Sequence, residues 1–111
     1  MRDHRLYLDD ILEAIHRIQK YTKGLSLNKL AGDTLVLDAV VRNLEIIGEA
    51  AKNIPAPIKE KHPEIEWKKI SGMRDILAHE YFGIDFEVIL DIVKNKLPTL
   101  KVRVSAILKK K

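Results

Sequence analysis

The stretch that decides the fold is T-L-V-L-D-A-V-V-R-N-L-E-I-I-G-E-A-A-K-N, residues 34–53. Its apolar residues fall into two stripes at helical spacing. One stripe consists of Val40, Leu44, Ile47, Ala51 and Ile54, and the other of Val36, Ala39, Ile46 and Ala50. The polar residues collect in a strip formed by Asp38, Arg42, Glu45 and Glu49. A helix that is apolar on two sides is covered on both, so we expect this one to lie at the centre of the fold or between subunits.

Three further long helices are predicted around this one. Residues 3–22 have apolar residues at spacings of three and four, and Gly24 follows as a stop. The segment 25–32 is a connector with one helical turn opened by Ser26, and the prolines at 55, 57 and 63 mark a loop. A third helix runs from about residue 64–66 to residue 80, and a fourth starts after Asp85. Pro98 predicts a kink or a fresh start in that helix, so the expected fold is an all-α antiparallel four-helix bundle.

Length and composition limit the protein to one domain, residues 1–111. The chain has no cysteine, so disulfides and thiolate chemistry are excluded. No apolar run reaches membrane-spanning length and no signal peptide is evident, so we expect a cytoplasmic protein that does not contact a membrane. The net charge is +4, and the basic residues gather in the C-terminal quarter, which is compatible with nucleic acid but also with a solvated helix face.

The candidate site is R-D-I-L-A-H-E-Y, residues 74–81, at the end of the third helix. Arg74 is permanently charged and has a planar fork of donors suited to a phosphate. His79 can accept and release a proton near neutral pH, and the phenol of Tyr81 can hydrogen-bond, stack on a base or be modified. Asp75, one helical turn before His79, can orient or charge-stabilise the imidazole. A metal-independent ribonuclease needs a base for the ribose 2′-hydroxyl and a cation for the phosphate, and this segment supplies both.

The spacing within this motif sets a geometric condition. Arg74 and Tyr81 are seven residues apart and share a helix face, whereas His79 lies about 140° around the helix from Arg74. An intact helix therefore does not bring Arg74 and His79 together. Either the helix loosens near Gly83, or a second subunit supplies the missing group across a two-fold axis.

Other residues capable of site chemistry have plainer interpretations. Asn43, beside the apolar stripes, is expected to be a buried and hydrogen-bonded amide. His62, between Lys61 and Pro63, is expected to be a solvated loop residue, and Trp67 a core residue. Glu45 and Glu49 fit an ion-pair strip or a dimer contact better than a metal site, because no histidine or third carboxylate falls at matching spacing. We expect neither a metal nor a cofactor.

Taken together, these segments resemble the HepT-like branch of the HEPN superfamily. The resemblance is carried by A-V-V-R-N-L-E-I-I-G-E-A at residues 39–50 and by I-E-W-K-K-I-S-G-M-R-D-I-L-A-H-E-Y at residues 65–81. The G-I-D at residues 83–85 and the L-P at residues 97–98 fit as well. The match covers nearly the whole chain, and its combined blocks are far more specific than the motif alone.

The resemblance implies a HEPN-like helical bundle that forms a homodimer. It implies the toxin of a type VII-like toxin–antitoxin pair, which cleaves RNA without a metal, with Arg74 and His79 as the catalytic pair. It also implies that Tyr81 accepts AMP from a minimal nucleotidyltransferase antitoxin, which silences the toxin. The family often has asparagine directly after the arginine, where this chain has Asp75. That carboxylate puts a negative charge near the phosphate, which weakens catalysis, or raises the basicity of His79.

The mechanism that follows is a hypothesis. His79 takes the proton of the 2′-hydroxyl, the oxygen attacks the adjacent phosphorus, and Arg74 stabilises the phosphate charge to give a 2′,3′-cyclic phosphate. His79 of the partner subunit is the natural acid for the leaving group. Two alternatives stay open. One is a non-catalytic, nucleotide-binding partner subunit of a small nucleotidyltransferase, and the other is a structural dimer in which the motif has no chemical role.

Overall fold

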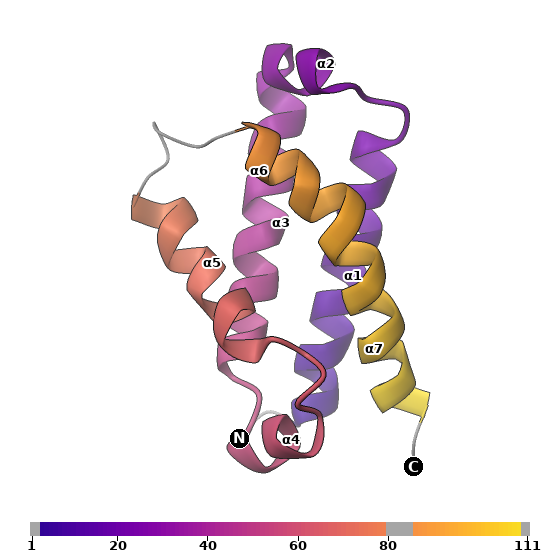
Figure 1. Cartoon of the computed structure of the whole chain (residues 1–111), viewed down its shortest axis with the longest axis vertical. Coiled ribbons are helices and arrows are strands. Elements are labelled where there is room, and N and C mark those ends of the chain that lie inside the picture. Colours follow the sequence, from indigo (N-terminus) through magenta and orange to yellow (C-terminus); the bar gives the residue numbers. More distant parts are fainter. Residues whose placement is uncertain (1–2, 80–85, 110–111) are drawn as a thin grey trace.

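In a computed structural model, the chain is an all-α bundle, as predicted (Figure 1). The structure describes residues 3–79 and 86–109, with the side chains of Leu27, residues 74–79 and Phe86 left outside the description. The long helices are α1 (His4–Thr22), α3 (Thr34–Lys52) and α5 (Trp67–His79), and the last long segment joins α6 (Phe86–Asp91), a π-helical turn η2 (Ile92–Lys96) and α7 (Leu97–Lys109). Short helices α2 (Leu27–Gly32) and α4 (Ala56–Lys61) lie in the connections.

The bundle is arranged around α3. This helix packs against α1 on one side and α5 on the other, and α7 packs against α1, so the chain reverses direction from one long helix to the next (Figure 1). Val40, Leu44 and Ile47 have no exposed surface, which confirms the first predicted stripe as the core. The second stripe is covered only in part, because Val36 and Ile46 stay half-buried. Apolar burial on two sides therefore fixes α3 at the centre.

Side chains define where three helices begin. The carboxylate of Asp3 accepts a hydrogen bond from the Arg5 backbone N–H at 2.9 Å, and that of Asp33 accepts one from Val36 at 3.1 Å. The Ser26 hydroxyl accepts a hydrogen bond from the Lys29 backbone N–H. Each bond satisfies a donor that has no partner inside its helix. The predicted start at Ser26 and the predicted end before Gly24, which has a φ of 77°, are both confirmed.

Helix α4 was not expected from the sequence, which predicts only a loop around its prolines. Pro55 occupies the N-cap and Pro57 lies in the first turn, where an α-helix needs no backbone N–H from either. The carbonyl of Pro55 accepts backbone bonds from Ile58 and Lys59. Pro55 and Pro57 follow the end of α3, as predicted, but these two prolines also start the next helix.

Pro98 lies in the first turn of α7, which confirms the predicted restart. Proline lacks an N–H, and its ring clashes with the carbonyl four residues earlier. The chain accommodates this with the π-helical turn η2, in which the backbone N–H of Leu97 donates to the carbonyl of Ile92, five residues earlier. The last long helix is therefore widened at one turn, so that buried residues on both sides of the proline, Val93 and Leu100, can face the core.

Basic side chains fasten α7 to the rest of the bundle. Arg5 at the start of α1 donates to the carbonyl of Leu108 at 2.6 Å. Lys101 lies 3.5 Å from the Gln19 side-chain oxygen on α1, and Arg103 donates to the carbonyl of Glu64 in the connection between α4 and α5. Two basic residues of the C-terminal quarter, Lys101 and Arg103, thus help to hold α7 in the bundle.

Asn43 differs from the prediction in one respect. It is buried, as expected, and its amide N–H donates to the carbonyl of Ala39 at 2.8 Å. Its side-chain oxygen, however, accepts no hydrogen bond in the part of the chain that the structure describes. A buried acceptor without a donor costs about 1–3 kcal/mol, so the amide is satisfied only on its donor side.

Within residues 3–79 and 86–109, no helix has the length and apolar character needed to cross a membrane.

We expect Leu44→Ala to lower the free energy of unfolding by about 2–5 kcal/mol, because it empties a fully buried position between helices. The matched control is Leu35→Ala in the same helix, where the side chain is 82% exposed and the loss should stay within about 0.5 kcal/mol. Urea unfolding at low protein concentration compares the two. Equal losses would show that α3 does not form the core of the single chain.

Candidate functional site

Helix α5 carries three of the four predicted site residues. Its backbone is helical from Trp67 to His79, so Arg74 and Asp75 lie in its C-terminal half and His79 is its last residue. The side chains of these three residues lie outside the described part of the chain, and Tyr81 lies outside it altogether. The structure therefore places the backbone of the predicted catalytic pair.

The helical register between Arg74 and His79 bears on how they act. Because α5 is an uninterrupted α-helix across both, their Cα atoms are offset by about 7.5 Å along the axis and about 140° around it. Asp75 is four residues before His79, on the same helix face. Gly83, where the sequence allows the helix to loosen, lies outside the described residues. The helical backbone up to His79 therefore does not by itself bring Arg74 and His79 together.

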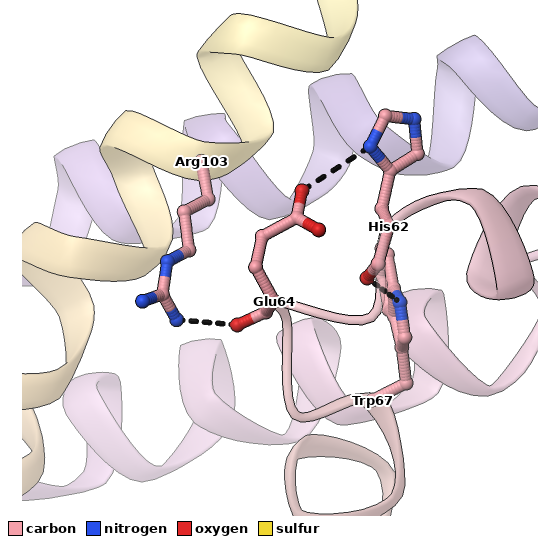
Figure 2. A network of polar contacts seen from close by, with 4 residues as sticks. All are labelled: His62, Glu64, Trp67 and Arg103. Atoms are coloured by element: carbon pink, nitrogen blue, oxygen red, sulfur yellow. Dashed lines mark hydrogen bonds and ion pairs between the residues drawn. The ribbon is translucent and has the colours of Figure 1, made fainter.

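The start of α5 is held by a polar network that joins three segments (Figure 2). The Trp67 indole N–H donates to the carbonyl of His62 at 3.0 Å, and His62 Nδ1 lies 3.2 Å from the Glu64 carboxylate. Arg103 of α7 donates to the Glu64 carbonyl. Trp67 is 7% exposed, which confirms it as a core residue. The expectation of a solvated His62 is wrong, because its side chain is only 14% exposed and is paired with Glu64.

Sequence reasoning did not identify this network. Arg103 is 39 residues from Glu64, and no local pattern connects the two positions. The proximity of His62 to Trp67 could have been suspected from the tight loop around Pro63, because an indole N–H in the core needs an acceptor. The network fixes the N-terminal end of the helix whose C-terminal end carries the motif.

Electrostatics at the start of α5 favour negative charge. Lys69 Nζ lies 2.8 Å from the Glu66 carboxylate. This hydrogen bond and the charge of Lys69 are the largest causes that lower the pKa of Glu66, and the charges of Lys96 and Arg103 add to them. In return, Glu66 raises the pKa of Lys69. Cations from α5, η2 and α7 thus act on one carboxylate.

Two buried polar side-chain atoms have no hydrogen-bond partner among the described residues. One is the side-chain oxygen of Asn43, and the other is the hydroxyl of Ser71. Ser71 lies on α5, three residues before Arg74, so it is one helical turn from the motif. Each atom can take part in a hydrogen bond with a further group, and each loses free energy while it does not.

One ion pair lies in the predicted polar strip of α3. Glu45 lies 3.8 Å from the exposed Arg42, which agrees with the predicted pairing. Among the described residues, no three histidine, aspartate or glutamate side chains converge as a metal site would require.

Comparison with known proteins gives a consistent picture. The sequence model of the family described as "Ribonuclease HepT-like" matches residues 11–107. The chain is 47% identical over 100 residues to "Probable ribonuclease HepT" of Thermococcus cleftensis, covering 90% of this chain and 91% of that protein. It is 42% identical over 110 residues to a candidate RNase of Caldanaerobacter subterraneus subsp. tengcongensis, covering 99% of this chain and 98% of that protein. No solved structure matches the chain significantly.

We expect the Glu66 carboxyl to titrate at a lower pH than an ordinary glutamate, because Lys69 stabilises its charged form. In Lys69→Gln its pKa should rise toward the ordinary value. Because the folded state lowers the pKa of Glu66, the Lys69–Glu66 pair stabilises the fold at a pH above the unfolded-state pKa of this carboxyl. The contribution is lost as the pH falls through the lower folded-state pKa. Both side chains are exposed, so the contribution is small. Carboxyl NMR titration measures the pKa, and the same value in both proteins would contradict the pairing.

Proposed function

This chain belongs to the HepT-like ribonuclease family of the HEPN superfamily, and from this membership we propose that it is an endoribonuclease with Arg74 and His79 as its catalytic pair. The observation that carries the proposal is the placement of both residues on the last two turns of α5. Their residue types supply a fixed cation and a group that transfers protons near neutral pH. The reaction needs both and no metal ion.

The proposed reaction is an internal transesterification of RNA. His79 removes the proton of a ribose 2′-hydroxyl, and that oxygen attacks the adjacent phosphorus. The bond from phosphorus to the 5′-oxygen breaks, which leaves a 2′,3′-cyclic phosphate and a 5′-hydroxyl. Arg74 stabilises the negative charge that builds up on the phosphate oxygens. His79 of the partner subunit protonates the departing 5′-oxygen.

The homodimer in this proposal is supported by two observations. The first is the offset of Arg74 and His79 along an intact α5, which a residue from a second subunit resolves. The second is the surface of α3, where Leu35 is 82% exposed and Ala39 and Ile46, four and eleven residues later, are half-buried. These three positions share one helix face, so α3 has apolar surface left for a partner.

We further propose that the protein is the toxin of a type VII-like toxin–antitoxin pair. Its partner is a minimal nucleotidyltransferase that transfers AMP from ATP to Tyr81. The phenolic oxygen attacks the α-phosphorus, pyrophosphate leaves, and the phenol proton is lost. Tyr81 is two residues after His79. An adenylyl group attached there adds a phosphate charge and a base beside the catalytic pair, which excludes the RNA phosphate.

The ribonuclease is tested by RNA cleavage in the presence of EDTA. We expect His79→Ala to lower the cleavage rate by about 10²–10⁴, the usual value of general acid–base catalysis. Arg74→Ala should lower it by about 10²–10³, the usual loss when one charge-stabilising donor is removed. The wild-type products should carry 2′,3′-cyclic phosphate ends.

Matched controls are His16→Ala and Arg17→Ala, which replace the same residue types at exposed positions of α1. Both should cleave RNA at the wild-type rate. If a dimeric, unmodified wild type does not cleave RNA with EDTA present, the proposed activity is wrong. The non-catalytic role as partner of a nucleotidyltransferase would then be the better interpretation.

Modification is tested by incubating the protein with the nucleotidyltransferase and ATP. Intact-mass analysis should show a gain of one adenylyl group on the wild type and none on Tyr81→Phe, which removes only the phenolic oxygen. The modified wild type should lose RNA cleavage. An adenylylated Tyr81→Phe protein would place the acceptor elsewhere.

A further inference from the structure

The charge of this chain is divided unevenly along its length. Residues 92–111 contain seven of the 20 basic residues and none of the 16 acidic ones. The first 91 residues are left with 13 basic against 16 acidic residues and are net negative. The whole positive excess of the protein therefore resides in η2, α7 and the residues after them. Such a division produces a directed surface field, which a net charge of +4 alone does not reveal.

The basic side chains of this segment contact different parts of the bundle. Lys101 of α7 contacts Gln19 of α1. Arg103, two residues later, bonds the Glu64 carbonyl before α5 (Figure 2). Lys96 of η2 is exposed and acts on the same carboxylate, Glu66, as Arg103 does. One side of the η2–α7 segment thus brings positive charge to the start of α5.

The start of α5 adds a cation of its own. Lys69 lies 2.8 Å from Glu66, and the side chain of Lys69 is 82% exposed. Lys69, Lys96 and Arg103 come from α5, η2 and α7, and together they act on the single carboxylate of Glu66. We name these three cations the α5–η2 basic surface. They outnumber the two carboxylates of this region, Glu66 and Glu64, so the surface keeps a positive excess that an added anion would stabilise.

The α5–η2 basic surface and the proposed catalytic motif share helix α5. Lys69 and Arg74 are on the same uninterrupted helix, five residues apart, which is about 7.5 Å along its axis and about 140° around it. An RNA strand bound at the surface therefore reaches the motif by passing along and partly around α5. The Arg103 guanidinium has five N–H donors, and the bond to the Glu64 carbonyl engages one of them, so it can hold a loop and a phosphate together.

We propose that the α5–η2 basic surface binds the phosphodiester backbone of the RNA and leads it along α5 to Arg74 and His79. The proposal rests on the proposed ribonuclease function and adds the path of the substrate. Binding through phosphates carries no base specificity. It makes affinity depend on salt, because each phosphate contact releases condensed counterions.

The experiment measures the affinity of a fluorescent oligouridylate by anisotropy as a function of salt concentration. The proteins carry His79→Ala, so that the RNA stays intact. The test variant adds Lys69→Gln and Lys96→Gln, two exposed side chains, and leaves Arg103 in place because it holds the Glu64 loop. Each lost phosphate contact should reduce the slope of log affinity against log salt by about 0.7. At about 0.1 M salt, the two together should weaken binding about 25-fold.

The control variant is Arg17→Gln with Lys29→Gln, which removes the same two charges from exposed positions of α1 and α2. It should keep the salt slope of the His79→Ala parent, because exposed charges beyond about 10 Å are screened at 0.1 M salt. An unchanged slope in the test variant overturns the proposal. Equal reductions in both variants also overturn it, because they would reflect net charge and not this surface.

A second measurement separates this proposal from the ribonuclease itself. With His79 restored, Lys69→Gln and Lys96→Gln should raise the KM for RNA about 25-fold and leave kcat near the wild-type value, since neither side chain belongs to the catalytic pair. Cleavage with an unchanged KM refutes the substrate path and leaves the ribonuclease intact. Absence of cleavage by the wild type refutes the ribonuclease, whereas the binding experiment still reports on the surface.

Discussion

The burial of α3 on two sides is the constraint on which the rest of the structure depends. Val40, Leu44 and Ile47 lose all contact with solvent, and both α1 and α5 pack on this helix. At roughly 25 cal/mol per Å² of buried apolar area, such side chains contribute about 1.5–3 kcal/mol each. No other helix has apolar residues on two faces in this way, among those the structure describes. The position of α5, and so of the motif, follows from the central helix.

The two ends of α5 are held by different means. At its start, the indole of Trp67, the His62–Glu64 pair and Arg103 join the helix to the preceding loop and to α7. Toward the motif, packing against α3 supports the helix through the half-buried Ile70 and Met73. A helix fixed at its origin and along one face is a rigid support for the side chains that it carries, as the proposed reaction requires.

The basic residues of the C-terminal segment have two roles. Lys101 fastens α7 to α1, and Arg103 fastens it to the loop before α5. Lys96 and Arg103 also place positive charge beside Glu66 at the start of α5. The same segment thus completes the bundle and gives one side of it a positive field. This explains why a segment of high positive charge is folded as an ordered helix, with Leu100 and Val104 buried beneath the charges.

The sequence by itself determined the bundle, its long helices and the start of α7 near Pro98, and it supplied the residue types of the candidate site. These features depend on local spacing, capping side chains and proline chemistry, which neighbouring residues in the chain specify. The sequence did not predict helix α4, the partial burial of His62 or the unsatisfied oxygen of Asn43. Nor could it show that Arg103 meets Glu64 or that the charges of three cations lower the pKa of Glu66. Only the tertiary structure decided these, because contacts between residues some 40 positions apart arise from helix packing and leave no periodic pattern in the chain.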